Sequence, residues 1–346
     1  MNILSGASEF FGLDIGTSAV RVVQLSGAGP VKSLVRYAQA PIDPKLSTSD
    51  AKADQQKLVQ VIKTLLASAQ ITTKNVAVGI PSQKVFTAVF DIDRLAPEEL
   101  AKTIQYQADS MIPTPVPESK LDWVLLGDSP QDKTKVEILL TSVTNEFVEQ
   151  RLDMLEMIGL DVIAFEPDNI AVTRALLAAD AAVPQMVVDI GRQSTDLVIS
   201  MNGGPRLTRS IPTGVDSILK AATQNLNIEA AQAEQFVFKF GLSKDKLEGQ
   251  IYHAIIGTID LLASEIDKSI KFFMARYPQA KLDRIVMTGG ASILPEFPLY
   301  IANKFGISVE IGNAWRNVAF DAVRQNELLA VSNHFGVAVG LAERKE

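Results

Sequence analysis

A strand–turn–strand pattern with an Asp and a Gly occurs twice in this chain, once in each half. Residues 12–18 read Gly-Leu-Asp-Ile-Gly-Thr-Ser, and residues 187–196 read Val-Val-Asp-Ile-Gly-Arg-Gln-Ser-Thr-Asp. In both, an apolar run ends at the Asp, a turn of Gly and hydroxyl residues follows, and a second β-like run leaves it, at 19–25 and 196–201. Because such turns can present backbone N–H groups to phosphate oxygens, the duplication predicts two half-domains that close on one polyphosphate.

The side chains of the two turns suit a magnesium–nucleotide complex. Asp14 and Asp189 lie at strand ends, where a carboxylate can hold a water of hydrated Mg²⁺. The residues expected to contact phosphate through backbone N–H or hydroxyl groups are Gly16, Thr17, Ser18, Gly191, Ser194 and Thr195. Either segment alone is compatible with an ordinary hairpin turn, whereas two matching copies favour a phosphate site.

A third glycine site lies near the end of the sequence. Residues 284–295 contain an apolar run that ends at Gly289-Gly290 and continues into a polar turn before the next expected helix. Two consecutive glycines give a flat backbone against which a base or ribose can lie, although a plain strand–helix turn is the alternative. The sequence has no G-x-x-x-x-G-K-[ST] and no G-x-G-x-x-G that opens a helix, which argues against P-loop and dinucleotide-binding proteins.

Composition narrows the class of protein further. A chain of 346 residues usually holds two domains. The net charge is −7, from 33 basic and 40 acidic residues, and this balance argues against a nucleic-acid partner. The absence of Cys excludes disulfides and thiolate chemistry, and the presence of only two histidines, His253 and His334, excludes a His-rich metal site.

The sequence also bears on membrane association. It has no run of about 20 apolar residues that could span a bilayer, and residues 1–8 lack the basic region of a signal peptide. Residues 343–346 follow the last expected helix too closely to form an amphipathic membrane helix. We therefore expect a cytoplasmic protein without direct membrane insertion, for which any association with the inner face of the cell membrane would need a partner.

Strand and helix signals alternate in both halves of the chain. The expected strands lie near 10–16, 19–26, 31–38, 75–80, 84–91 and 161–165, and the expected helices near 51–69, 97–110 and 145–158. The second half repeats the opening meander near 185–211 and then becomes helical, with a core-type apolar stripe between 251 and 273. The proline-rich run at 113–117 predicts an extended surface loop.

These features together resemble the actin-like ATPase superfamily, whose signature is two phosphate loops, an adenosine motif and two connecting helices. The first connecting helix is expected at 165–176 and the second at 334–342, and both carry small residues where helices must pack closely. In bacterial members, a Glu before Pro in the first connector orients the attacking water. Glu166 before Pro167 matches that position, with a strand-end carboxylate near a turn as the alternative.

Within the superfamily, the sequence is most similar to the PilM family of type IV pilus assembly proteins, and it also resembles the division protein FtsA. The similarity includes the stretches 81–90, 96–108, 112–123 and 136–143, which resemble an inserted subdomain. It implies an α/β, actin-like fold of two domains with duplicated mixed sheets and an FtsA-type insertion. The expected boundaries are 1–30, 163–185 and 311–346 for domain I, 31–162 for the inserted subdomain, and 186–310 for domain II with a helical lobe at about 215–280.

The resemblance implies ATP and Mg²⁺ as cofactors and adds residues to the nucleotide site. The added residues are Arg192, Gly214, Glu234, Glu265, Lys268 and Ala291. For Glu265 and Lys268, a solvated pair three residues apart on a helix is the alternative. The family usually has a Lys three residues after the Glu that corresponds to Glu234, and here that position holds Val237. Only Glu234 is therefore carried over from this motif.

Three classes of function fit the resemblance: a nucleotide-binding adaptor of a pilus platform with slow or no ATP turnover, a small-molecule kinase, and an FtsA-type filament protein. The inserted subdomain and the short tail favour the adaptor. Its implied partner is the N-terminal cytoplasmic tail of a PilN-like bitopic membrane protein. The groove between domain I and the insertion is the expected site, with Ile112, Pro113 and Trp123 on its rim. Pilus motor components and a second copy of the chain are further candidate partners.

Overall fold

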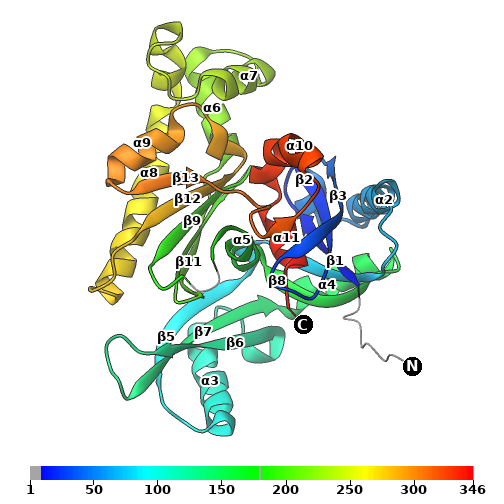
Figure 1. Cartoon of the computed structure of the whole chain (residues 1–346), viewed down its shortest axis with the longest axis vertical. Helices are drawn as coiled ribbons and strands as arrows, with labels where there is room; N and C mark the ends of the chain where they lie inside the picture. Colours follow the sequence, from blue (N-terminus) through cyan, green and yellow to red (C-terminus); the bar gives the residue numbers. More distant parts are fainter. Residues whose placement is uncertain (1–8, 179–180, 346) are drawn as a thin grey trace.

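The computed structural model describes residues 9–178 and 181–345. Residues 1–8, on which the expectation about a signal peptide rests, lie outside this range. The described residues build three β-sheets: Figure 1 shows the first in blue on the right, the second in green and orange on the left, and a smaller third sheet below them. Among the helices of the described residues, none combines the length and apolar character that crossing a membrane requires.

The first sheet has six strands in the order β14-β3-β2-β1-β4-β8. Its strands are β1 (Phe10–Ile15), β2 (Ala19–Ser26), β3 (Lys32–Pro41), β4 (Asn75–Ile80), β8 (Asp161–Pro167) and β14 (Val318–Ala319). The first three form the expected antiparallel meander, and β4 and β8 extend the sheet in parallel. The helices of this half are α1 (Pro44–Thr48), α2 (Lys52–Ala69), α4 (Asn145–Glu156), α5 (Asp168–Leu176), α10 (Gln325–Val331) and α11 (Gly336–Ala342).

The second sheet has the order β11-β10-β9-β12-β13 and repeats the plan of the first. It consists of β9 (Gln185–Ile190), β10 (Thr195–Met201), β11 (Gly204–Ile211), β12 (Arg284–Gly289) and β13 (Ser308–Ile311), with helices α6 (Val215–Leu226), α7 (Ala230–Phe240), α8 (Gln250–Arg276) and α9 (Phe297–Phe305). Strands β9 to β11 form an antiparallel meander and β12 joins in parallel. The expected apolar stripe of α8 is buried in the core of this half.

Helices α5 and α11 lie between the two sheets and join the halves. Apolar residues of both helices share one cluster with Ala77 of the first sheet and with Val187 and Val286 of the second. Their contact is close because small residues face each other: a Cβ on Gly340 would lie 1.8 Å from the carbonyl oxygen of Ala171. The expected small-residue packing of the two connecting helices is therefore present.

The third sheet, of order β5-β7-β6, forms the inserted subdomain. It contains β5 (Phe86–Asp93), β6 (Ser119–Asp128) and β7 (Lys135–Thr144), and α3 (Pro97–Met111) packs on it around Leu100, Ile104 and Ile138. The insertion is shorter than the expected 31–162. The chain from 32 to 80 belongs to the first sheet, because β3 completes the hydrogen-bonding edge of β2 and β4 pairs with β1.

Candidate functional site

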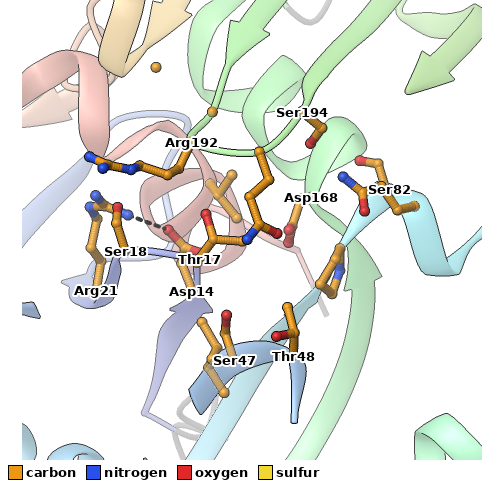
Figure 2. A pocket seen from close by; sticks show the side chains of 18 of the residues that line it. Asp14, Thr17, Ser18, Arg21, Ser47, Thr48, Ser82, Asp168, Arg192 and Ser194 are labelled. Carbon is orange, nitrogen blue, oxygen red and sulfur yellow. Dashed lines mark hydrogen bonds and ion pairs between the residues drawn. The ribbon is translucent and has the colours of Figure 1, made fainter. Parts of the chain in front are cut away.

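The two expected phosphate turns face each other across a cleft between the halves. The turn after β1 supplies Gly16, Thr17 and Ser18, and the turn after β9 supplies residues 191–194. Figure 2 shows these side chains converging, with Asp14, Thr17 and Ser18 below and Arg192 and Ser194 above. The cavity has a volume of about 690 Å³, within the ordinary range of small-molecule sites.

The backbone of the two turns is closed in the same way. The N–H of Gly16 donates to the carbonyl of Ala19 at 3.1 Å, and the N–H of Gly191 donates to that of Ser194 at 2.8 Å. A Cβ on Gly16 would lie 3.1 Å from the carbonyl oxygen of Ala19, and a Cβ on Gly191 would lie 3.1 Å from that of Ser194. Both distances are shorter than side chains usually allow. The repeated sequence motif therefore corresponds to a repeated local structure, and each copy leaves further backbone N–H groups for an anion.

The third glycine site forms the other end of the cleft. The φ of Gly289 is +81°, and a Cβ there would lie 2.4 Å from the carbonyl oxygen of Ile190. A Cβ on Gly290 would lie 3.6 Å from Val215 and 3.9 Å from His334, so the glycine leaves room between these two side chains. Burial and the charge of Arg21 lower the pKa of His334 to about 4, so the imidazole is neutral at pH 7. This end suits an uncharged nucleoside.

Glu234 has a cationic partner in the cleft that the sequence did not indicate. Val237, at the usual Lys position, is buried in the core of the second half. Arg192 of the second phosphate turn instead lies in the cleft and pairs with Glu234 at 3.0 Å and with Asp216 at 2.6 Å. Phe238, one residue after Val237, also lines the cleft. Glu234 therefore has a cationic partner, supplied by a different part of the chain.

Four carboxylates line the phosphate end: Asp14, Asp168, Asp189 and Asp196. Burial raises the pKa of Asp189 to about 7, and the charges of Asp196 and Asp14 act in the same direction. Burial also raises the pKa of Asp14, whereas its ion pair with Arg21 at 3.3 Å lowers it. Buried carboxylates that repel one another are stabilised by a cation, so this end fits a metal ion.

The spacing of the carboxylates defines what kind of metal complex they fit. Within residues 9–178 and 181–345, no three acidic or histidine side chains are close enough together to bind one ion directly. Mg²⁺ keeps several of its waters and usually takes one or two carboxylates together with substrate phosphates. Asp14 and Asp189 therefore suit a hydrated Mg²⁺ that arrives with a nucleotide, rather than a metal site built from protein ligands alone.

Asp168 is an acid of the cleft that the sequence did not single out. It is the first residue of α5 and lies in the cleft, and its Oδ1 atom is buried without a hydrogen-bond partner. The carboxylate packs over Gly79, where a Cβ would lie 2.2 Å from Oδ1. Burial and the charges of Asp14 and Asp196 raise its pKa well above the usual range. An acid directly after Pro167 at a helix start was the available signal.

Glu166 lies two residues earlier and does not line the cleft. Its carboxylate is buried and accepts hydrogen bonds from Arg174, at 2.9 Å from Nη1, and Arg344 lies 3.5 Å away. The structure therefore places this acid in an ion-pair network beside α5, with Asp168 as the acid of the first connector that faces the cleft.

Other expected nucleotide residues lie behind the wall of the cleft or away from it. Thr195 is buried and donates to the carbonyl of Thr213, and Ala291 is fully buried. Gly214 lies behind the second turn, where a Cβ would be 2.6 Å from the carbonyl oxygen of Gly191. Glu265 and Lys268 are outside the cleft: they pair with each other at 2.5 Å on the surface of α8, and Glu265 also pairs with Arg209.

The residues expected to bind a partner lie on the inserted subdomain in different environments. Ile112 is buried in its core, Trp123 packs partly against that core, and Pro113 is exposed. Near the end of the proline-rich segment lies a second hollow of about 570 Å³. We call it the acidic groove; it is lined by Thr114, Pro117, Glu118, Thr144, Asn145, Glu146, Glu149, Gln150 and Asp153.

Comparison with known proteins agrees with this architecture. The family model described as type IV pilus assembly protein PilM matches residues 12–346. A solved structure, the PilM-PilN type IV pilus biogenesis complex, contains a chain 26% identical to this one, with 96% of this chain and 97% of that chain covered and a TM-score of 0.82.

Two more distant structures share the fold. The ethanolamine utilization protein EutJ from Carboxydothermus hydrogenoformans is 16% identical, with 99% of this chain and 91% of that chain covered and a TM-score of 0.57. MreB5 of Spiroplasma citri bound to ADP is 13% identical, with coverages of 96% and 95% and the same TM-score of 0.57. The expected actin-like ATPase fold, with its duplicated sheets, is confirmed.

Proposed function

The chain belongs to the type IV pilus assembly protein PilM family, and we propose from this premise that it is an ATP-binding adaptor of the pilus assembly platform in the cytoplasm. Its partner would be the N-terminal tail of a PilN-like membrane protein, which recruits it to the membrane. One observation carries the nucleotide part of the proposal: two matching phosphate turns face each other beside buried carboxylates. A related chain solved in a complex with PilN supports the partner.

Each part of the nucleotide would have its own contacts in the cleft. Backbone N–H groups of the turns at 16–18 and 191–194 would hold the phosphates, and Asp14 and Asp189 would hold the waters of the metal. Gly289 and Gly290 would lie against the nucleoside. When bound, Mg²⁺ supplies positive charge that offsets the repulsion between these carboxylates and the phosphates.

The acidic groove is the proposed site for the partner's tail. Glu118, Glu146, Glu149 and Asp153 give it negative charge, and Pro117 adds an apolar surface. An extended tail with a positive amino terminus and basic side chains is complementary to this lining. Charge-assisted hydrogen bonds from the tail to these carboxylates, offset by the cost of ordering the tail, make micromolar affinity the expected range.

Calorimetry with a peptide of the PilN-like tail from the same organism tests the partner. We expect the wild-type protein to bind it with micromolar affinity, and the Glu146→Lys/Glu149→Lys variant to bind at least about tenfold more weakly, because two lysines then offset the two remaining acids of the lining. The matched control is Glu98→Lys/Glu99→Lys, which inverts two exposed acids on α3 outside the groove. No binding by the wild type, with or without Mg-ATP, would refute the proposal; equal binding by both variants would move the docking site.

We expect slow ATP turnover, well below the ~1–100 s⁻¹ of dedicated kinases, because among the described residues Asp168 is the one acid of the first connector that lines the cleft and could orient a water. Asp168 is the acid of the first connector that faces the cleft, so Asp168→Asn should remove the residual rate while Mg-ATP still binds. Glu166→Gln is the comparison, since this acid is paired with Arg174. Phosphate release from purified protein measures both. A kinase-like wild-type rate would contradict the adaptor, and loss of activity only in Glu166→Gln would return the role to Glu166.

A further inference from the structure

Beyond Asp168 the cleft continues into a compartment that the nucleotide contacts above leave unused. Its walls are the segment 46–50 around the end of α1, the short 3₁₀ turn η1 (Ser82–Lys84), and one face of α4. Figure 2 shows Ser47 and Thr48 on the side of the pocket opposite the second phosphate turn, and Ser82 on its flank. We call this space the rear compartment. It shares one continuous cavity with the phosphate turns.

Arg151 of α4 is the main charged group of the rear compartment. Its Nη1 lies 3.9 Å from the sulfur of Met154, and its guanidinium lies 5.3 Å from the centre of the Phe147 ring. Neither contact satisfies a planar cation with five N–H donors. Burial lowers the pKa of Arg151, and the charges of Asp168 and Asp50 act in the opposite direction. Within the described residues, neither acid comes within ion-pair distance of it, so its donors remain available.

A second cation faces the same aromatic ring. The Nζ of Lys84, on η1, lies 6.0 Å over Phe147, so Lys84 and Arg151 share this side chain. In the part of the chain that the structure describes, Lys84 likewise forms no ion pair with a carboxylate. The hydroxyl of Ser82, two residues earlier, is buried in the same wall. Both cations and this hydroxyl therefore line the same cavity as the phosphate turns.

We propose that the rear compartment is a phosphate-binding site, in which Arg151 and Lys84 hold a tetrahedral oxyanion just beyond Asp168. The guanidinium can donate two parallel hydrogen bonds to such a group, and the ammonium of Lys84 adds a point charge from η1. This inference rests on the proposed nucleotide binding, because the phosphate would come from the nucleotide. Two sources share this chemistry: the terminal phosphate of bound ATP, and inorganic phosphate after cleavage.

Titration of nucleotides and phosphate into purified protein tests the site. Three quantities are measured for each variant: the affinity for Mg-ADP, the ratio of ATP to ADP affinity, and the affinity of the Mg-ADP complex for inorganic phosphate. For Arg151→Ala we expect the ratio of ATP to ADP affinity, the affinity for inorganic phosphate, or both to fall about tenfold. The affinity for Mg-ADP should stay within about twofold of the wild type. If only the ratio of ATP to ADP affinity falls, the site binds the terminal phosphate of ATP. If the affinity for inorganic phosphate falls, the site binds the free ion.

Two further variants keep the test decisive. Lys84→Ala changes an exposed side chain, so it folds whether or not Arg151→Ala does, and about a threefold loss in the same quantities is expected. Arg94→Ala, which removes an exposed ion pair with Asp128 in the inserted subdomain, should change nothing. Unchanged values in both compartment variants would overturn the inference. If the wild type bound no nucleotide, the proposed function would fail, and phosphate titration of the nucleotide-free protein would still decide the site.

Discussion

Asp189→Asn is expected to remove magnesium-dependent ATP binding and also to stabilise the nucleotide-free protein at neutral and alkaline pH. The carboxylate is buried at the phosphate end of the cleft, and burial with the neighbouring Asp196 and Asp14 raises its pKa from 3.8 to about 7. The ionised form is therefore costly until a cation arrives. An amide carries no charge, so it removes this cost and the support for the metal together.

The pH dependence follows from the direction of this shift. A group whose pKa is raised in the folded state holds its proton more tightly there than in the unfolded chain. Its contribution to stability is complete below about pH 4 and is lost as the pH rises through about 7. Each pH unit within this window costs up to about 1.4 kcal/mol in the wild type, and the Asn variant avoids that loss. The advantage of Asp189→Asn should therefore grow from pH 4 to pH 7 and then level off.

Two measurements check this prediction. Nucleotide titration with Mg²⁺ and with a chelator should show at least a tenfold loss of Mg-ATP affinity for both Asp189→Asn and Asp14→Ala. Thermal unfolding without nucleotide at pH 5 and pH 8 should show the stability gain of Asp189→Asn mainly at pH 8. Asp267→Asn, on the surface of α8, is the control for the loss of one negative charge. Unchanged Mg-ATP affinity in both variants would show that Asp14 and Asp189 do not hold the metal.

The closed form of the two turns after β1 and β9 could be predicted from the sequence because it depends on local structure. Each turn closes on itself within four residues, from Gly16 to Ala19 and from Gly191 to Ser194, so the residue types alone define it. The acid of the first connector was harder to place. Glu166 and Asp168 are two residues apart, and which of them faces the cleft depends on where β8 ends and α5 begins.

Long-range contacts account for most of what the sequence did not indicate. The pairing of β4 with β1 joins segments about sixty residues apart, and local periodicity carries no signal for it. The expected helix at 145–158 is present as α4, but the sequence did not indicate that this helix lies between two cavities. Gln150 lines both the cleft and the acidic groove, so this helix separates the two cavities. Such a placement depends on how α4 packs against α2 and β8.

The contact between the inserted subdomain and the second half was also absent from the sequence reasoning. Glu137 of β7 is 2% exposed and accepts hydrogen bonds from Arg276 at 2.8 Å and from the Tyr277 hydroxyl at 2.6 Å. Arg206 of β11 lies 3.3 Å from the same carboxylate. Burial lowers the pKa of Arg206, and the charge of Glu137 acts in the opposite direction. Asp91 completes the cluster through an ion pair with Arg276 at 2.7 Å.

Glu137→Ala should destabilise the protein by about 3–5 kcal/mol, because it leaves the buried Arg206 without its ion-pair partner and removes the shared acceptor of Arg276 and Tyr277. Chemical denaturation followed by tryptophan fluorescence measures this. In a Trp315→Phe background the remaining Trp123 reports on the inserted subdomain, which should unfold or detach first. Arg94→Ala is the exposed control, with an expected loss below about 1 kcal/mol.

A second variant separates the lost partner from the lost packing. Glu137→Leu/Arg206→Met replaces both charges with apolar side chains, so less charge is left buried and unpaired, and we expect it to recover part of the stability. A loss below about 1 kcal/mol for Glu137→Ala would show that the cluster contributes little to the union of the two parts. No recovery in the double variant would mean that Arg276 and Tyr277, rather than Arg206, carry the dependence on the carboxylate.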